Sequence, residues 1–148
     1  MSAVSPTLPA AGSTAAAGPI TLTLPPIPTM VRVGRLTASS VASLADMSID
    51  DIDDIKIAVS EMITVLIQSG SRTNITLRFE TTATEFAVEA TAPTPTNDLG
   101  RNDLALAIAV LEAVADQHHV ASTDDRIMIR IVKRLSPIPT GSAPSTRA

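Results

Sequence analysis

Two pairs of alternating apolar stretches constrain this chain more than any other feature. Residues 75–79 and 86–90 carry apolar side chains at every second position, and only a short turn around Thr82 separates them. Residues 118–121 and 126–135 repeat this arrangement around a Ser-Thr-Asp-Asp turn. Alternation with period two is typical of a strand with one buried face, and two such strands across a short turn form a hairpin. The sequence therefore predicts an antiparallel sheet that needs a cover on one face.

Three segments with helical periodicity can supply that cover. Apolar residues recur at spacings of three and four from Met30 to Leu44 and again from Ser48 to Leu66. Residues 102–116 are apolar nearly all round, which predicts a buried helix. Residues 20–24 alternate like a further strand. The order is then β-α-α-β-β-α-β-β, and we expect an α+β fold, a two-layer α/β sandwich.

The first two helices are each expected to turn one apolar stripe toward the sheet. In the first helix these residues are Met30, Val33, Thr37, Val41 and Leu44. In the second helix they are Ile52, Ile55, Val59, Met62, Ile63 and Leu66. Gly34 lies inside the first helix, where glycine costs up to about 1 kcal/mol relative to alanine. It either marks a close approach to a neighbouring element or is tolerated there.

Polar residues place the ends of these helices. Thr29 can cap the first helix, and the Ser48 hydroxyl can cap the second, with Asp51 three residues on. Four aspartates between residues 50 and 54 occupy the first turns of the second helix, where the helix dipole favours anions. This acidic run is either a solvated helix start or an acidic docking surface. Ser69-Gly70-Ser71 ends the helix.

Composition divides the 148 residues into one domain and two tails. Residues 1–19 and 136–148 consist mainly of Ser, Thr, Ala, Pro and Gly. Such segments bury too little apolar surface to offset the entropy of ordering them, so we expect both to be disordered. Residues 20–135 are aliphatic, with two Phe and no Trp, Tyr or Cys, and are numerous enough to fold independently.

Charge and hydropathy argue against several classes of protein. The chain has no basic start followed by an apolar run, and no uncharged apolar stretch near the roughly 20 residues that span a bilayer. The absence of cysteine fits a reducing compartment, so we expect a cytoplasmic protein. The net charge of −4, without a basic cluster, disfavours nucleic-acid binding.

Several segments carry a family resemblance. Residues 35–43 read R-L-T-A-S-S-V-A-S, residues 48–65 read S-I-D-D-I-D-D-I-K-I-A-V-S-E-M-I-T-V, and residues 111–116 read L-E-A-V-A-D. These segments resemble the bacterial anti-sigma-factor serine kinases, a branch of the GHKL or histidine-kinase-like ATPases. The resemblance extends over residues 20–135 and implies the histidine-kinase-like ATPase fold, whose element order is the one expected above. It also implies three nucleotide motifs.

The first motif is a glutamate followed four residues later by an asparagine on one helix face. In the family the carboxylate acts on the attacking nucleophile and the amide holds Mg²⁺. Here Glu61 keeps the acid, whereas Val65 stands at the asparagine position. Valine offers no oxygen to a hard cation. Glu61 would be catalytic only if the protein is an active kinase; otherwise it is a surface residue on the flank of the helix.

The second and third motifs are also altered. The family's adenine-binding aspartate and the glycine two residues later correspond to Thr91 and Pro93, and proline cannot adopt the positive φ open to glycine. The phosphate-binding G-x-G turn corresponds to Ala105 and Ala107, which should extend the third helix through that turn. Residues 92–101 form a connection rather than a nucleotide lid. We therefore expect a degenerate site without Mg-ATP, which aliphatic packing of Val65, Ala105 and Ala107 could have closed.

Other chemistry finds little support in the sequence. His118 and His119 are adjacent at the start of a strand, so their side chains face opposite ways and no metal site is expected. Arg32 and Arg35 lie one turn apart on the first helix. They form either a solvated face or a partner surface, because the helix resembles the one that relatives use for dimers and sigma factors.

Three hypotheses of function follow. The first is a non-catalytic, anti-sigma-factor-like regulator of transcription, a pseudoenzyme that binds a sigma factor, an anti-sigma antagonist or a related kinase subunit. The second is an active protein serine/threonine kinase that binds Mg-ATP and phosphorylates an anti-sigma antagonist, with Glu61 as its base. The third is a structural dimerisation module with disordered tails. A homodimer is compatible with each of them.

Overall fold

The computed structural model describes residues 18–93 and 101–136 and confirms the predicted α+β order. The three helices are α1 (Met30–Leu44), α2 (Ile49–Gln68) and α3 (Arg101–Val114). The five strands are β1 (Ile20–Leu24), β2 (Ile75–Thr81), β3 (Glu85–Pro93), β4 (Gln117–Ser122) and β5 (Arg126–Arg134). Most of the two predicted tails and of the connection after β3 lies outside the described residues.

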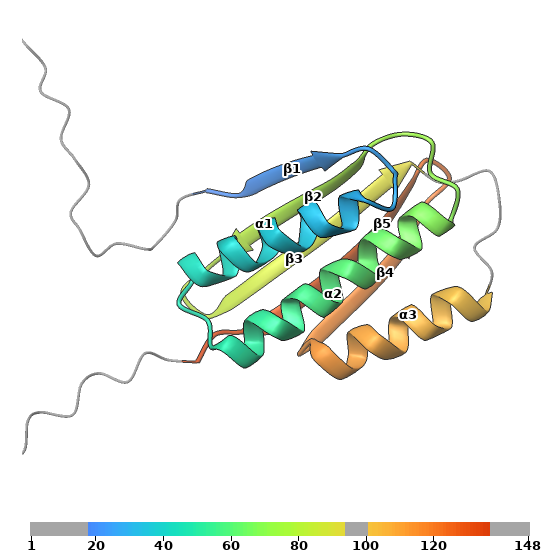
Figure 1. Cartoon of the computed structure of the whole chain (residues 1–148). Coiled ribbons are helices and arrows are strands. Elements are labelled where there is room, and N and C mark those ends of the chain that lie inside the picture. The colour runs from blue at the N-terminus through green and yellow to red at the C-terminus, as the bar shows by residue number, and fades with distance from the viewer. Residues whose placement is uncertain (1–17, 94–100, 137–148) are drawn as a thin grey trace, which may run out of the picture.

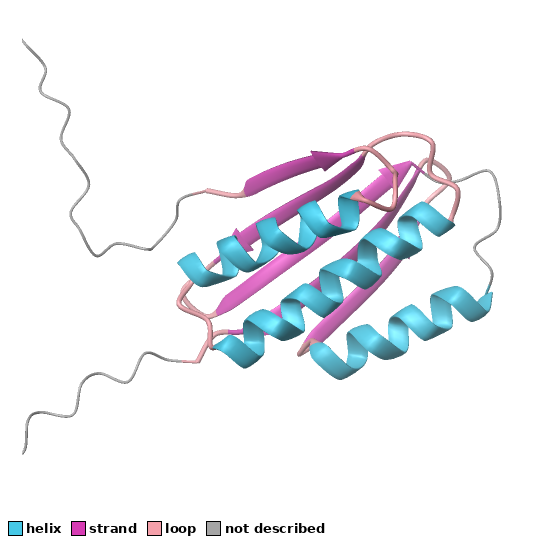
Figure 2. Cartoon of the chain, viewed as in Figure 1, coloured by secondary structure: helices cyan, strands magenta, loops and turns pink. Residues whose placement is uncertain are grey.

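The strands form one antiparallel sheet in the order β1-β2-β3-β5-β4. Both predicted hairpins are present, and the pairing of β3 with β5 joins them. The helices α1, α2 and α3 lie side by side on one face of this sheet (Figure 1). Figure 2 shows the resulting two layers, one of helices and one of strands. The predicted two-layer sandwich is thus confirmed.

The core lies between these layers. On the helix-facing side of β3, Phe86, Val88, Ala90 and Ala92 are buried, and the neighbouring strands add further buried residues to the same cluster: Leu24, Ile75, Leu77, Phe79, Ile127, Ile129 and Ile131. The predicted α2 stripe enters this cluster, with Ile52 at its edge. Alternation in the strands and periodicity in α2 therefore identified the core faces correctly.

The buried face predicted for α1 was partly wrong. Val33 and Leu44 are exposed, whereas Gly34, Ala38, Val41 and Ala42 are buried. The reason is the short distance between α1 and α2. A Cβ atom on Gly34 would overlap Cδ1 of Ile63, so any larger residue there would have to displace that side chain. Small residues at spacings of four let the two backbones approach, and larger apolar residues are left at the surface.

The helix ends agree only partly with the predicted caps. Ser48 caps α2, because its Oγ accepts from the backbone N–H of Asp51 at 3.1 Å. Gly70, with φ of 81°, follows the end of α2 as expected. Thr29 occupies the N-cap position of α1 but makes no side-chain cap, because its own backbone is already helical. Turn hydrogen bonds to the carbonyls of Ile27 and Pro28 replace that cap.

The prediction that the third helix is buried all round was wrong. Ala107 and Leu111 are buried, but Ala105, Leu106 and Ala109 are exposed, and Leu106 retains 66% of its accessible surface. α3 lies at one end of the helical layer and packs against α2 and β4 (Figure 1). An outer helix in a two-layer fold has neighbours on only part of its circumference, whatever its composition.

The helix-free face of the sheet is polar. Arg78, Glu89 and Arg130 stand in register across β2, β3 and β5. Arg78 pairs with Glu80 at 2.6 Å, and Arg130 lies 3.5 Å from Glu89 and 3.7 Å from Glu80. Opposite charges on adjacent strands support the pairing. Within residues 18–93 and 101–136, none of the helices combines the length and hydropathy that crossing a membrane requires.

Candidate functional site

α2 carries the first of the predicted site residues. Glu61 lies near the middle of the helix and is half-buried, without a hydrogen bond or ion pair to another described residue. Glu61 is therefore accessible to a reactant or a partner, and no described residue orients its carboxylate.

Val65 and Ala107 occupy the places of the family's metal ligand and phosphate turn. Val65 is 2% exposed and Ala107 3% exposed, and both belong to the same apolar cluster as Ala90 and Ala92. Ala105 lies two residues before Ala107, on the exposed side of α3. The structure thus brings Val65 and Ala107 into one core but does not include Ala105. No side chain among these three can offer an oxygen to Mg²⁺.

Thr91 and Pro93 do not join them. Along β3, the residues that face the helices are Phe86, Val88, Ala90 and Ala92, so Thr91 and Pro93 lie on the opposite face of the sheet. Thr91 is paired with Thr76 and Met128 in the neighbouring strands. The residues assigned to the adenine motif and those assigned to the metal motif are consequently on different sides of the sheet. Ala92 is the helix-facing neighbour of Thr91.

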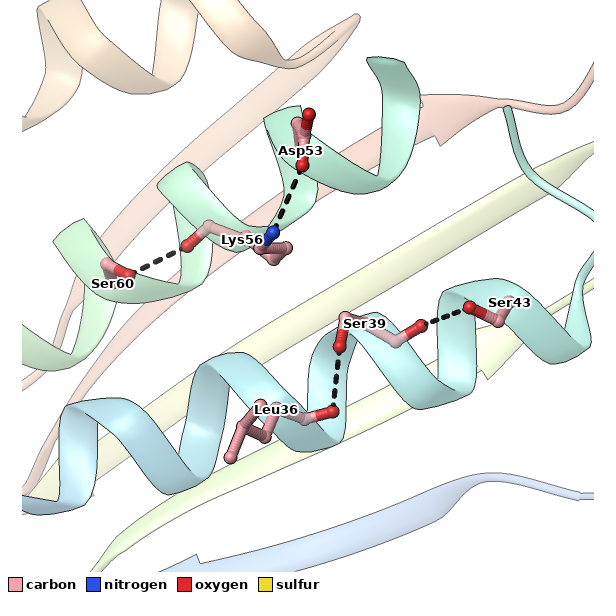
Figure 3. Close-up of polar contacts among 6 residues, drawn as sticks. All are labelled: Leu36, Ser39, Ser43, Asp53, Lys56 and Ser60. Atoms are coloured by element: carbon pink, nitrogen blue, oxygen red, sulfur yellow. Dashed lines mark hydrogen bonds and ion pairs between the residues drawn. The ribbon is translucent and has the colours of Figure 1, made fainter. Parts of the chain in front are cut away.

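Both candidate partner-binding arginines lie on the outer surface of α1. Arg32 and Arg35 are exposed and make no ion pair to another described residue, and Leu36 beside them is 59% exposed. Ser39 Oγ donates to the carbonyl of Leu36 at 3.0 Å, and Ser43 Oγ donates to that of Ser39 at 2.8 Å (Figure 3). These hydroxyls already have acceptors within their own helix, so covering them costs little.

Comparisons with known proteins agree with this architecture. No protein-family model matches the sequence. A segment of 45 residues is 56% identical to the serine-protein kinase RsbW of Listeria monocytogenes and of Listeria innocua. The structure superposes on the crystal structure of the RsbU and RsbW domains of Rv1364c from Mycobacterium tuberculosis with a TM-score of 0.65. The chain has the fold of the RsbW domain.

The extent of these similarities differs. The segment similar to the Listeria RsbW kinases is 30% of this chain and spans 29% of the length of those relatives. The structural similarity to the mycobacterial RsbU and RsbW domains covers 80% of this chain and 32% of the other, at 17% sequence identity. Sequence similarity to RsbW is therefore concentrated in a part of the domain, whereas the RsbW fold extends over most of it.

Sequence reasoning missed the polar cluster that joins the start of α2 to the sheet. Lys133, in the last strand, is 8% exposed, and its Nζ lies 2.8 Å from Asp54 Oδ2 and 3.2 Å from Asp51 Oδ1. The acidic run is thus neither wholly solvated nor wholly a docking surface. The alternation of the last strand could have revealed this cluster, because Lys133 continues the buried series Ile127, Ile129 and Ile131. A buried ammonium group needs carboxylate partners.

The pKa of Lys133 reflects these contacts. Burial lowers the pKa of its ammonium, but the hydrogen bonds and charges of Asp54 and Asp51 outweigh that effect and raise the pKa above its ordinary value of 10.5. Asp53 instead pairs with Lys56 at 3.0 Å on the exposed side of α2 (Figure 3). Lys133 therefore stays charged at neutral pH, and its contacts hold the first turns of α2 on the sheet.

The two histidines lie on the exposed edge strand. His118 is opposite Ile131 and His119 opposite Arg130, so their side chains lie on different faces of the sheet, as predicted. In the described part of the chain, no three His, Asp or Glu side chains gather closely enough to hold a metal ion.

Proposed function

We propose that this protein is an RsbW-like, cytoplasmic regulator that acts by binding another protein and has lost the Mg-ATP site of the kinases that it resembles. The partner class that the resemblance implies is a sigma factor, an anti-sigma antagonist or a related kinase subunit. The Listeria relatives are named serine-protein kinases. We therefore propose that this chain shares their fold but not their kinase activity.

The burial of Val65 is the observation that carries this proposal. Its side chain is enclosed with Ala107, Ala90 and Ala92 in one apolar cluster, where a kinase of this type would need an oxygen ligand. The helix α3 already spans Ala105 and Ala107, so this part of the backbone forms helical hydrogen bonds instead of an open turn. The residues present therefore do not fit Mg-ATP.

The outer surface of α1 supports the binding role. It combines exposed Leu36 with two arginines that form no ion pair with another described residue and with serine hydroxyls that are satisfied within the helix. A surface of this kind offers apolar area and positive charge at a small desolvation cost. It suits a partner that presents acidic residues around an apolar contact.

Two measurements test the proposal. Calorimetric titration with millimolar Mg-ATP and Mg-ADP should give no heat of binding, and neither nucleotide should raise the melting temperature. Micromolar nucleotide binding would contradict the loss of the site. Titration with purified sigma factors and antagonists should reveal a partner whose binding the double variant Arg32→Glu, Arg35→Glu abolishes. Arg72→Glu, another exposed arginine, is the matched control and should bind normally.

Active phosphotransfer is the second candidate function. The names of the Listeria relatives and the accessible position of Glu61 on α2 favour it. An assay with radiolabelled ATP and candidate antagonists should show no incorporation by the natural chain. Incorporation that Glu61→Ala removes would establish this second function in place of the first, and incorporation that survives Glu61→Ala would point to a contaminating kinase.

A further inference from the structure

Two large apolar side chains stand at the surface where the first two helices meet. Leu44 is the last residue of α1, and Ile49 is the first residue of α2. Leu44 retains 69% of its accessible surface and Ile49 retains 79%, more than the other exposed large apolar side chains among the described residues. The short connection between the two helices places both at one corner of the helical layer (Figure 1). We call Leu44 and Ile49 the corner pair.

The fold does not use either side chain of the corner pair. Ser48 caps α2, and the two residues that usually pack together around such a cap are then Met47 and Ile52. Met47 is buried in the core cluster, and Ile52 packs against it. The end of α1 is likewise anchored by other residues than Leu44, since Val41 and Ala42 face the core. The corner pair therefore leaves apolar area in water that a partner could cover.

The connection that carries the corner pair is held in place at both ends. The backbone N–H groups of Asp46 and Met47 donate to carbonyls in the last turn of α1, at 3.1 and 3.4 Å. The contacts of Lys133 hold the first turns of α2 on the sheet. An ordered backbone thus presents the two side chains, so covering them costs little backbone entropy.

The charge around the corner pair is negative. Asp46 and Asp50 are exposed and form no ion pair with another described residue. Lys56 already has a carboxylate partner at 3.0 Å, and Lys133 is buried between two aspartates. Arg134 follows Lys133 in β5 and therefore lies on the helix-free face of the sheet. The carboxylates at this corner consequently outnumber the cations that could balance them.

Apolar area beside unbalanced carboxylates defines the chemistry of a partner. A membrane surface with anionic lipids would be repelled. An amphipathic helix whose apolar stripe is flanked by Lys or Arg complements both features. Arg35, on the Arg32 and Arg35 surface, lies nine residues before Leu44, about 13 Å along the axis of α1. That surface carries the opposite charge, so the two surfaces favour different partners.

We propose that the corner pair, with Asp46 and Asp50, is a docking surface for a basic amphipathic helix of another protein. The two leucine-sized side chains would enter the apolar stripe of that helix, and its Lys or Arg residues would face the carboxylates. This surface is separate from that of Arg32 and Arg35 and does not require it. Neither does the proposal depend on whether the nucleotide site is lost.

Titration of the full chain with defined peptides tests this surface. The probe is a helical peptide of leucine and lysine, roughly 14 residues long, and its control has glutamate in place of lysine. The backbone amide resonances of residues 43–53 should shift with the lysine peptide and not with the glutamate peptide. Shifts that gather elsewhere, equal binding of the two peptides, or no binding at millimolar peptide would overturn the proposal. Sedimentation of the protein with phosphatidylglycerol vesicles would also overturn it, in favour of a membrane surface.

Matched variants separate this docking from general attraction to a chain of net charge −4. The double variant Leu44→Ser, Ile49→Ser should bind the lysine peptide about thirtyfold more weakly, at an unchanged melting temperature, because both side chains are exposed. Leu106→Ser alters a similarly exposed leucine on α3 and should bind as the natural chain does.

A charge variant keeps the test decisive if the serine variant does not fold. Asp46→Asn, Asp50→Asn removes both carboxylates, and asparagine tolerates the φ of 54° at residue 46. Its affinity for the lysine peptide should fall about tenfold and lose most of its dependence on salt. Binding as tight as that of the natural chain in either double variant would refute the docking surface.

Discussion

The two halves of α2 lie over the same sheet but interact with it differently. The first half is held by charge, because Asp51 and Asp54 share the ammonium of Lys133. The second half is held by aliphatic contact, with Met62, Ile63, Val65 and Leu66 all buried. Only Glu61 interrupts this second half with a charge, and it is half-buried without a described partner.

This difference bears on the nucleotide site. Buried polar groups are stable only where partners satisfy them, and the first half of α2 meets that condition. The buried residues of the second half, Met62, Ile63, Val65 and Leu66, are all apolar members of the core cluster and offer no oxygen ligand to a metal ion. The comparison can therefore be tested by exchanging polar and apolar groups between the two halves.

The largest expected effect comes from placing a polar group in the second half. Val65→Asn buries an amide among aliphatic side chains and removes apolar contact, and should lower the free energy of unfolding by about 3 kcal/mol. Urea denaturation measures this loss. Thr64→Asn, at the half-buried neighbouring position, should cost less than about 1 kcal/mol. A stable Val65→Asn protein that binds Mg-ATP would show that the polar site is still available.

Removing the charge from the first half should have the next largest effect. Lys133→Met leaves two aspartates close together without their cation and should cost about 2 kcal/mol, less than for a fully buried pair because both carboxylates are partly exposed. Lys56→Met breaks the exposed pair with Asp53 and should change stability by less than about 0.5 kcal/mol. Equal effects of the two substitutions would mean that burial of Lys133 contributes nothing.

The contacts of Lys133 also predict how the free energy of unfolding depends on pH. Because the pKa of Lys133 is raised in the folded protein, its contribution to stability is complete below the ordinary value of 10.5 and is lost as the pH rises through the folded pKa. The difference in unfolding free energy between the natural chain and Lys133→Met should therefore be constant near neutral pH and narrow above about pH 10.5. A constant difference up to pH 12 would contradict the assigned contacts.

The smallest effect concerns the contact between α1 and the second half of α2. Gly34→Ala gains helix propensity but forces its new methyl group against Ile63, so the net loss should be about 1 kcal/mol. Ile63→Val shortens the side chain that the new methyl group would meet. Gly34→Ala should therefore lower stability less in the Ile63→Val protein than in the natural chain. Thermal unfolding of the natural chain, the two single variants and the double variant gives the coupling free energy between the two substitutions. Additive effects would show that the two residues do not touch.

Much of the fold could be predicted because its main signals are local. The hairpins follow from alternation and short turns, and the buried stripe of α2 follows from helical spacing. The buried faces of α1 and α3 could not be predicted in this way. Hydrophobic periodicity assumes that the largest apolar residues face inward, whereas close packing selected Gly34 and Ala38, and the outer position of α3 left Leu106 exposed.

The candidate site was predictable only in part for the same reason. Motif comparison identified Val65 and Ala107, and the structure places both in one apolar cluster. Motif comparison alone did not show that Thr91 lies on the other face of the sheet, although the alternation of β3, with Ala90 on the buried face, already implies it. The pairing of Lys133 with Asp54 joins residues 79 positions apart, which no local pattern reveals.

The place of β5 in the sheet has a consequence for synthesis on the ribosome. β5 is the last of the described strands, yet it lies between β3 and β4 in the interior of the sheet. Until residues 126–134 emerge, β3 presents an unpaired edge and the aspartates of α2 have no ammonium to bind. Folding must therefore wait for nearly the whole domain, and a nascent chain that pauses before Arg126 exposes an aliphatic strand that chaperones would have to shield.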